Sequence, residues 1–162
     1  NTAMDEDGID PLVRAVQANY RVNASYKVSD AVSLRTRVET VDFQRGTSPL
    51  EHGFLLYQDI VHRPLSSPLE LTLRFALYDT DSYNARIYAY ENDLIGVFSI
   101  PPYYGRGIRW YAMARLTPLR RVDIWLRYGA WINPDTASSG SGLQEIAGIR
   151  RSDIKLQMRW TF

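Results

Sequence analysis

The chain has 162 residues, of which 45% are hydrophobic, and its 19 basic and 18 acidic side chains leave a formal net charge of only +1. This balance gives no overall field that would favour nucleic acid or anionic lipid. The absence of cysteine excludes disulfides and thiolate metal sites. No stretch approaches the 18 consecutive apolar residues that a transmembrane helix requires.

Alternation of apolar and polar residues with a period of two predicts β-strands along the chain. Residues 16–28 alternate without a break, and residues 32–38 repeat the pattern before Val41 and Phe43 fall out of phase, which suggests a bulge. Residues 53–62 predict a strand whose two faces cannot be assigned, because apolar residues occupy both. No segment fits helical spacing comparably well.

The second half of the chain contains the clearest strands. They are predicted at residues 69–78, 108–116, 122–132 and 154–162. Two further strands, at residues 83–91 and 94–100 around Asn92 and Asp93, would raise the number of crossings from seven to nine. The sequence therefore predicts an all-β protein with about seven to nine strands.

Strand length separates the two environments that produce such alternation. Strands of soluble sandwiches usually have about five or six residues, whereas a strand that crosses a membrane needs about 9 to 11. The predicted strands are of the longer kind, and their polar faces are dense in arginine. This combination predicts an antiparallel meander transmembrane β-barrel in a bacterial outer membrane.

Each predicted strand divides its residues between a lumen and the lipid. The charged residues expected to face the lumen are Arg21, Arg35, Arg37, Glu39, Glu70, Arg74, Arg86, Arg109, Arg115, Asp123, Arg127, Lys155 and Arg159. The residues expected to face lipid or to form an aromatic girdle are Tyr20, Tyr26, Leu71, Leu73, Phe75, Trp110, Leu126, Tyr128, Trp160 and Phe162. A cluster of Tyr103, Tyr104, Trp110 and Tyr111 is likewise expected at the outer lipid interface.

The links between strands predict the orientation of the barrel. Outer-membrane barrels have short periplasmic turns and long extracellular loops. The short links are at residues 29–30, 63–68 and 118–121, and the long ones are at residues 44–52, 79–106 and 133–152. Residues 1–10, with four acids and no base, then form an extracellular segment ahead of the barrel strands in residues 11–162. The resulting odd number of crossings indicates part of a larger barrel.

Several segments in residues 31–162 resemble one family. They are residues 77–81, 86–93, 100–107 and 140–143, together with Arg151 and Ser152. These are similar to the C-terminal region of large outer-membrane proteins of Bacteroidetes-type bacteria, which carry a helix-hairpin-helix, ComEA-like domain ahead of a barrel. The resemblance implies a longer chain and brings no transport substrate with it. The helix-hairpin-helix module is absent here, so no nucleic-acid partner is expected for this segment.

The inward arginines have two interpretations. They could line an anion-attracting pore, or they could form an interior ladder of ion pairs with Glu39, Glu70, Asp123 and tyrosines, because buried charges must be paired. A small barrel has its interior filled by side chains, which favours the ladder. In a large barrel, the pore and the ladder remain equally open.

The sequence contains little that supports a catalytic site or a metal site. His52 and His62, with Ser48, Ser66 and Glu51 nearby in sequence, invite a hydrolase interpretation. The predicted topology, however, puts the two histidines at opposite sides of the membrane. Metal ligation by Asp79, Asp81 and Asn84 lacks the spacing of a calcium loop, and a polar turn explains these residues better. No enzyme activity, metal or cofactor is expected.

The last predicted strand alternates up to Trp160 and Phe162, which resembles the signal recognised by the barrel-assembly machinery. We expect that machinery, outer-membrane lipid and lipopolysaccharide as partners, together with other outer-membrane subunits or the remaining part of the same barrel. The expected function is a non-catalytic pore wall or scaffold in the outer membrane. The alternatives are a small lipid-modifying outer-membrane enzyme and a soluble β-barrel or sandwich binding protein.

Overall fold

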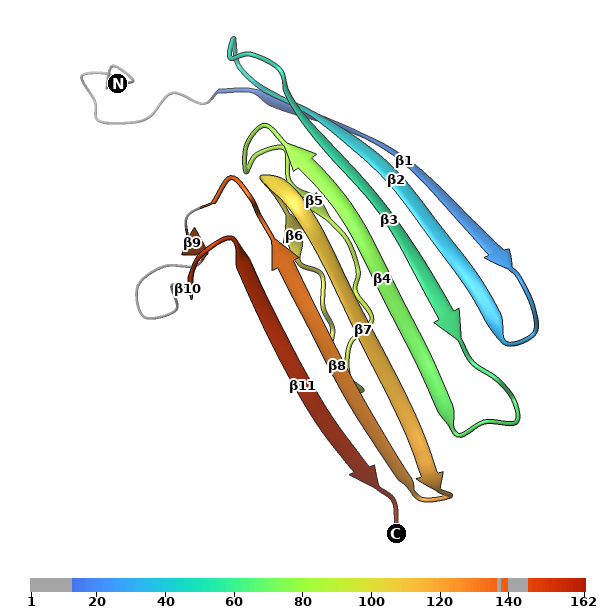
Figure 1. Ribbon diagram of the computed structural model, residues 1–162. Coiled ribbons are helices and arrows are strands. Elements are labelled where there is room, and N and C mark those ends of the chain that lie inside the picture. Colours follow the sequence, from blue (N-terminus) through green and yellow to red (C-terminus); the bar gives the residue numbers. More distant parts are fainter. Residues whose placement is uncertain (1–12, 137, 140–145) are drawn as a thin grey trace.

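The computed structural model describes residues 13–136, 138–139 and 146–162, so the predicted acidic segment at residues 1–10 lies outside the described residues. Seven long strands form one antiparallel sheet in which each strand pairs with its neighbours along the chain (Figure 1). The strands are β1 (Ala15–Lys27), β2 (Val32–Arg45), β3 (Glu51–His62), β4 (Leu69–Thr80), β7 (Arg106–Leu119), β8 (Val122–Ile132) and β11 (Arg150–Trp160). The predicted all-β antiparallel meander is confirmed.

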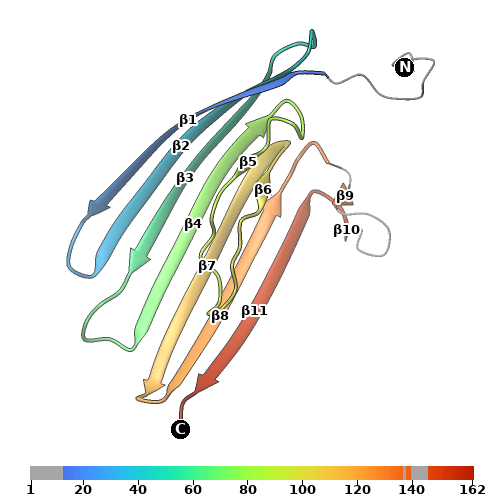
Figure 2. The ribbon, with the colours of Figure 1, turned by 180° about the vertical axis from the view of Figure 1, so that it is seen from behind.

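The sheet is open. Its edges are β1 and β11, and it is not closed into a barrel. Figure 2 shows the two edge strands on opposite sides of the sheet. No helix within the described residues is long and apolar enough to cross a membrane.

The short and long links gather at opposite ends of the sheet. Residues 28–31, 63–68 and 120–121 connect strands at one end, where the chain also finishes (Figure 1). The other end carries residues 46–50, 81–105, 133–136 and 146–149. The link at residues 46–50 is shorter than predicted, because β2 and β3 extend further and turn tightly at Gly46, whose φ is 58°.

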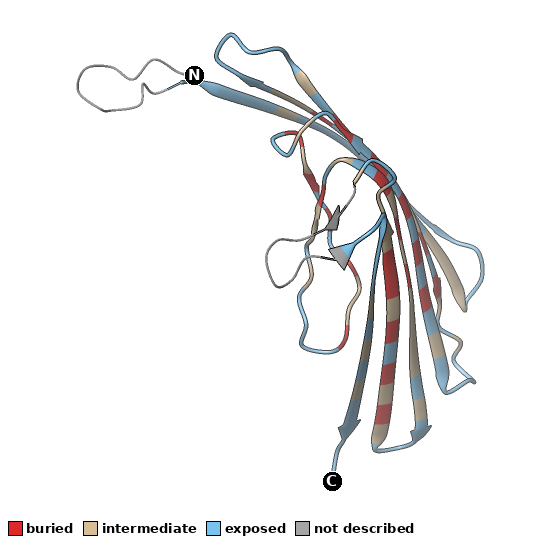
Figure 3. Cartoon of the chain, turned by 60° about the vertical axis from the view of Figure 1, so that its left-hand side comes forward, coloured by how far each residue is buried: buried red, intermediate tan, exposed pale blue. Residues whose placement is uncertain are grey.

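Residues 81–105 do not supply two further crossings, so that prediction was wrong. They leave the end of β4, fold back over one face of the sheet and return at the start of β7 (Figures 1 and 3). Within them, β5 (Ile87–Tyr88) pairs with β6 (Pro102–Tyr103), and an isolated bridge joins Glu91 to Ser99. We call residues 81–105 the covering hairpin. The short strands β9 (Ser138–Ser139) and β10 (Ile146–Ala147) pair in the last long link.

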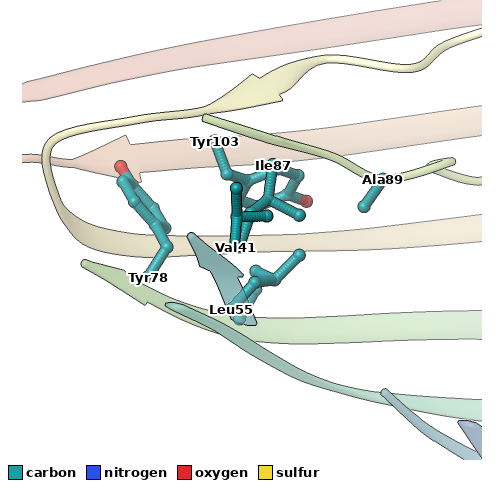
Figure 4. Packing of buried hydrophobic residues seen from close by; sticks show 7 residues of the cluster. Val41, Leu55, Tyr78, Ile87, Ala89 and Tyr103 are labelled. Carbon is teal, nitrogen blue, oxygen red and sulfur yellow. The ribbon is translucent and has the colours of Figure 1, made fainter. Parts of the chain in front are cut away.

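A small apolar core lies between the covering hairpin and the sheet (Figure 4). It is formed by Val41, Leu55, Ala76, Tyr78, Ile87, Ala89 and Tyr103, all nearly inaccessible to solvent. This core explains two features of the sequence. Strand β3 is apolar on both faces because the hairpin covers one of them. Val41 falls out of phase for the same reason and not because of a bulge, since β2 pairs in unbroken register with both neighbours.

Close backbone approach joins the hairpin to β3. A Cβ atom at Gly53 would collide with the carbonyl oxygen of Ala85. The amide of Asp81 also donates to the carbonyl of His52 over 2.9 Å. Glycine at position 53 therefore allows the first arm of the hairpin to lie directly against the sheet.

Candidate functional site

The charged residues predicted to share one face of the sheet do so, with the exception of Arg86. The pairing register places the others on the face that the covering hairpin lies against, which we call the polar face. Arg86 belongs to the hairpin, where its guanidinium donates to the hydroxyl of Tyr88 and to the carbonyl of Tyr83 over 2.8 Å each. Arg86 lies off the sheet because residues 83–91 do not form a crossing strand.

The predicted apolar residues lie together on the opposite face, which we call the apolar face, with Phe162 just beyond the end of β11. Along β4 the side chains alternate between buried and exposed positions (Figure 3). The exposed ones are apolar: Leu71 is 36% and Phe75 50% accessible, while Arg74 between them is only 3% accessible. This is the reverse of a soluble sheet, in which the apolar side chains are the covered ones.

Glu91 is the centre of the contact between the hairpin and the sheet. It is 1% accessible, and its carboxylate accepts two hydrogen bonds of 2.9 Å from Arg109 of β7. Arg127 of β8 donates a further hydrogen bond to it, and the hydroxyl of Tyr103 donates another over 2.8 Å. One hairpin carboxylate therefore joins two neighbouring strands and both arms of the hairpin.

Backbone carbonyls of the hairpin extend this contact across the sheet. Carbonyl oxygens of the first arm and the tip accept hydrogen bonds from side chains of β2, β4, β8 and β11. The pairs are Arg37 with Tyr88, Arg74 with Tyr90, Arg127 with Asn92 and Gln157 with Ile95. In addition, Lys155 of β11 contacts Asp93 at the tip. The polar face thus satisfies hairpin groups that would otherwise be buried without partners.

Ion pairs occupy most of the remaining polar face. Beneath the hairpin, Arg74 binds both oxygens of Asp59, and Arg37 binds Glu39. Arg21 of the edge strand β1, whose side chain is 47% accessible, also binds Glu39. Nearer the short links lies a second cluster. It pairs Arg115 with Glu70 and Asp123, Arg159 with Asp123, and Arg63 with Glu70. Of the two predicted arrangements, the described residues show the ladder of ion pairs.

Some of the acidic partners were not predicted from the sequence. Asp59 lies on the strand whose faces could not be assigned, and Glu91 and Asp93 lie in the covering hairpin, where crossing strands were predicted. Asp153, which pairs with Arg127 at 3.0 Å, precedes the predicted start of the last strand. The inward arginines themselves were the available signal, because buried guanidinium groups require carboxylates.

The environment of the hairpin shifts the pKa values of two of its groups. Burial alone would raise the pKa of Glu91, but the hydrogen bonds and charge of Arg109, with help from Tyr103 and Arg127, bring it below its ordinary value of 4.5. Burial and the neighbouring Glu91 raise the pKa of Tyr103 well above its ordinary value. At neutral pH the site therefore holds a carboxylate that accepts hydrogen bonds and a phenol that donates one.

The predicted aromatic cluster at the lipid interface divides between several locations. Tyr103 and Tyr111 are buried against the polar face, with accessibilities of 0% and 1%, so the prediction was wrong for them. Tyr104 is exposed on the hairpin. Only Trp110 lies on the apolar face, where its ring packs 5.4 Å from that of Tyr128. Tyr103 and Tyr104 are separated from Trp110 because residues 102–105 belong to the hairpin, which lies over the sheet.

Two cavities flank the covering hairpin. One, of about 300 Å³, lies between the hairpin tip and the second ion-pair cluster and is lined by Tyr90, Ile95, Arg115, Trp125 and Arg159 among others. The other, of about 230 Å³, lies near the long links beside Tyr78, Tyr104 and Trp131. The two cavities share no lining residue.

The two histidines lie at opposite ends of β3, ten residues or about 33 Å apart along the strand. His52 is bonded to Asp42 over 2.7 Å, whereas His62 lies beside the short link. They share no site. Asp79 pairs with Arg106 and Asp81 accepts from the amide of His52, which agrees with a polar rim. Within the described residues no group of three or more potential ligands could hold a metal ion.

These features define the chain as an all-β protein with an open meander sheet, an exposed apolar face, and a polar face closed by a hairpin. No protein-family model matches the chain, and comparisons with curated proteins and with solved structures find no match either.

Proposed function

We propose that the sheet is part of the wall of a transmembrane β-barrel in a bacterial outer membrane and acts as a non-catalytic scaffold rather than as an open pore. The observation that supports this most directly is that the usual burial pattern of a soluble sheet is reversed. Apolar side chains are exposed across all seven strands, and many of the charged side chains are buried. Monomeric soluble proteins rarely expose so large a continuous apolar surface.

The dimensions of the apolar face fit a bilayer. On β4 the exposed apolar residues run from Leu69 to Leu77, a distance along the strand of about 27 Å at roughly 3.4 Å per residue, which is about 21 Å along the membrane normal at a strand tilt of about 40°. Outer-membrane barrels carry an apolar band of about 25 Å with aromatic residues at its borders. Polar groups limit the band at the long-link end, where Asp42, His52, Asp79 and Arg106 form a row of ion pairs.

The connections support the same proposal. Every link joins neighbouring antiparallel strands, and the two long links, after β4 and after β8, lie at the same end of the sheet (Figure 1), as the long loops of outer-membrane barrels do. We propose that the short links face the periplasm. Lipid and lipopolysaccharide would then contact the apolar face, and the barrel-assembly machinery would bind the exposed edge strand β11.

A scaffold is favoured over an anion-selective pore because the buried arginines of the polar face, Arg37, Arg74, Arg109 and Arg127, are bonded to carboxylates. Those beneath the hairpin are bonded to carboxylates or to hairpin carbonyls, and the hairpin covers the part of the face where they lie. Few free cations remain there to attract a passing anion. Planar-bilayer recordings of the intact protein should show no steady conductance, whereas a stable anion-selective conductance would contradict the scaffold proposal.

A charge on the apolar face tests the membrane location. Lysine in place of a residue in the middle of the lipid face of a barrel costs about 2–4 kcal/mol, whereas a surface substitution in a soluble protein usually stays within about 0.5 kcal/mol. We expect Leu73→Lys to destabilise the folded protein in lipid vesicles by about 2–4 kcal/mol.

The matched control is Leu65→Lys, because Leu65 is fully exposed in the short link between β3 and β4 and should tolerate lysine. Denaturant titration in vesicles measures both variants. If Leu73→Lys is as neutral as Leu65→Lys, or if the protein purifies without detergent and fails to float with membranes, the proposed location is wrong.

A further inference from the structure

The edges of the sheet and the thickness of the covering hairpin together limit how a barrel can be completed. Neither edge strand has a second partner within the described residues. Strands β1 and β11 run in the same direction, because an even number of antiparallel steps separates the first strand of the sheet from the seventh (Figure 1). The two edges therefore present the same strand polarity.

This shared polarity excludes two simple modes of closure. If the seven strands closed on themselves, β1 would pair with β11 in parallel. A second copy inserted in the same orientation would make the same parallel junctions, whereas an inverted copy would put its long links on the wrong side of the membrane. Outer-membrane barrels are built from antiparallel strands, so the partner of both edges must contain an odd number of strands.

The covering hairpin sets a lower limit on the size of the ring. Packed layers of strands lie about 10 Å apart, so a wall, a hairpin layer and an opposite wall need about 20 Å between the two walls. A ring of strands spaced by about 4.8 Å and tilted by about 40° has a radius of about 8 Å for eight strands and about 10 Å for ten. Eight strands leave too little space, and ten are sufficient.

The outer surface of the hairpin indicates what the opposite wall is like. Exposed side chains of the hairpin include Tyr88, Tyr90, Phe98 and Ile100, all at least 43% accessible, with Phe98 at 79%. The rings of Tyr90 and Phe98 lie 5.9 Å apart. An exposed apolar surface of this kind in an otherwise polar lumen requires a partner. In a ring near the lower limit, the opposite wall comes within contact distance of it.

We propose that both edges of the sheet bind one further wall with an odd number of antiparallel strands, at least three, whose lumen side is apolar where it faces Tyr90 and Phe98. The inference rests on the proposed barrel and specifies its partner. The completed ring has ten or more strands, and the covering hairpin fills its lumen. The partner is a polypeptide segment other than the described residues and other than a second copy of them.

The distance between the two edges tests this inference. In the full-length protein in native-type membranes, Ala24→Cys on β1 is paired in turn with Ile154→Cys, Leu156→Cys and Met158→Cys on β11, and each pair receives nitroxide labels. An excess of unlabelled protein removes distances between copies. Several β11 positions are needed because strands in a barrel are staggered.

We expect the shortest separation to be about 19 Å or more, which corresponds to four strand spacings of about 4.8 Å. The control pair, Val22→Cys with Val38→Cys, joins direct neighbours in the register and should give the short distance of adjacent strands. A separation of about 14 Å or less in the diluted sample, which corresponds to three strand spacings or fewer, means that fewer than three strands lie between the edges and overturns the inference.

A short distance that appears only without dilution means a ring of identical copies and also overturns the inference. Failure of the membrane proposal is recognised independently, because the labelled protein would then not float with lipid vesicles. A long edge distance in protein that floats supports both proposals.

Discussion

Replacement of Glu91 by glutamine should release the covering hairpin from the sheet. The carboxylate is 1% accessible and accepts hydrogen bonds from Arg109, Arg127 and Tyr103. Glutamine has almost the same shape but no charge, and its amide nitrogen is a donor that faces guanidinium donors. Glu91→Gln therefore removes the attraction while leaving the volume of the site unchanged.

The loss of hairpin stability expected for Glu91→Gln depends on the partners that Arg109 and Arg127 keep. Arg127 keeps the carboxylate of Asp153 at 3.0 Å and the carbonyl of Asn92. Arg109 keeps only Asp153, at 3.5 Å. Loss of one partner from a buried ion pair costs about 3–5 kcal/mol. Because Arg127 stays paired, we expect about 3 kcal/mol, which is roughly a hundredfold increase in the open population of the hairpin.

Limited proteolysis in detergent or vesicles measures this opening. Chymotrypsin cleaves after aromatic residues, and Phe98 at the hairpin provides a site that becomes cleavable when the hairpin leaves the sheet. The rate of cleavage within residues 81–105 should rise by about two orders of magnitude in Glu91→Gln, provided that opening is fast relative to cleavage. Denaturant titration gives the accompanying loss of global stability.

Glu70→Gln is the matched control. Glu70 pairs with Arg115 and Arg63 on the same face, but its side chain is 31% accessible and contacts no hairpin residue through those pairs. A partly exposed ion pair is worth about 0–1 kcal/mol, so the hairpin should stay protected. If the two variants show the same cleavage rate as the unaltered protein, Glu91 does not hold the hairpin against the sheet and its inferred role is wrong.

Further predictions concern the same contact. Gly53→Val should expose the hairpin to protease, because the new side chain collides with the backbone oxygen of Ala85; cleavage at the rate of the unaltered protein would contradict this. Tyr103→Phe removes one hydrogen bond to a charged group and should cost about 1.5–3 kcal/mol in a denaturant titration. Acid should also release the hairpin: since the folded pKa of Glu91 lies below 4.5, its stabilisation is complete above that pH and is lost as the pH falls through the folded pKa. Proteolysis with an acid-stable protease should show this loss in the unaltered protein and a much weaker pH dependence in Glu91→Gln.

The alternation of the sequence was sufficient to predict the long strands of the sheet and the faces of all of them except β3. Residues 69–78 and 122–132 appear as β4 and β8 with little change, and Leu73 and Arg74 lie on the two faces that the period of two assigns to them. Each strand repeats one simple local rule, and its neighbours in the sheet are its neighbours in the chain. A meander therefore needs little long-range information.

Residues 81–105 show where the local rule failed. Their alternation is real, with Ile87, Ala89 and Glu91 on one side and Tyr88 and Tyr90 on the other. The covered side, however, packs on the sheet instead of belonging to it. A period of two indicates an extended chain with two different environments, and it does not indicate which surfaces supply them.

The chemistry of the site likewise depended on the tertiary structure. From the sequence, the inward arginines required partners, and Glu39, Glu70 and Asp123 were correctly expected among them. Glu91 could not be assigned to Arg109 and Arg127, because these residues meet only when the hairpin turns back over β7 and β8. The sequence by itself determined the long strands, the faces of all of them except β3, and the need for buried carboxylates. Only the tertiary structure decided which carboxylate reaches which arginine, because that choice depends on contacts between segments far apart in the chain.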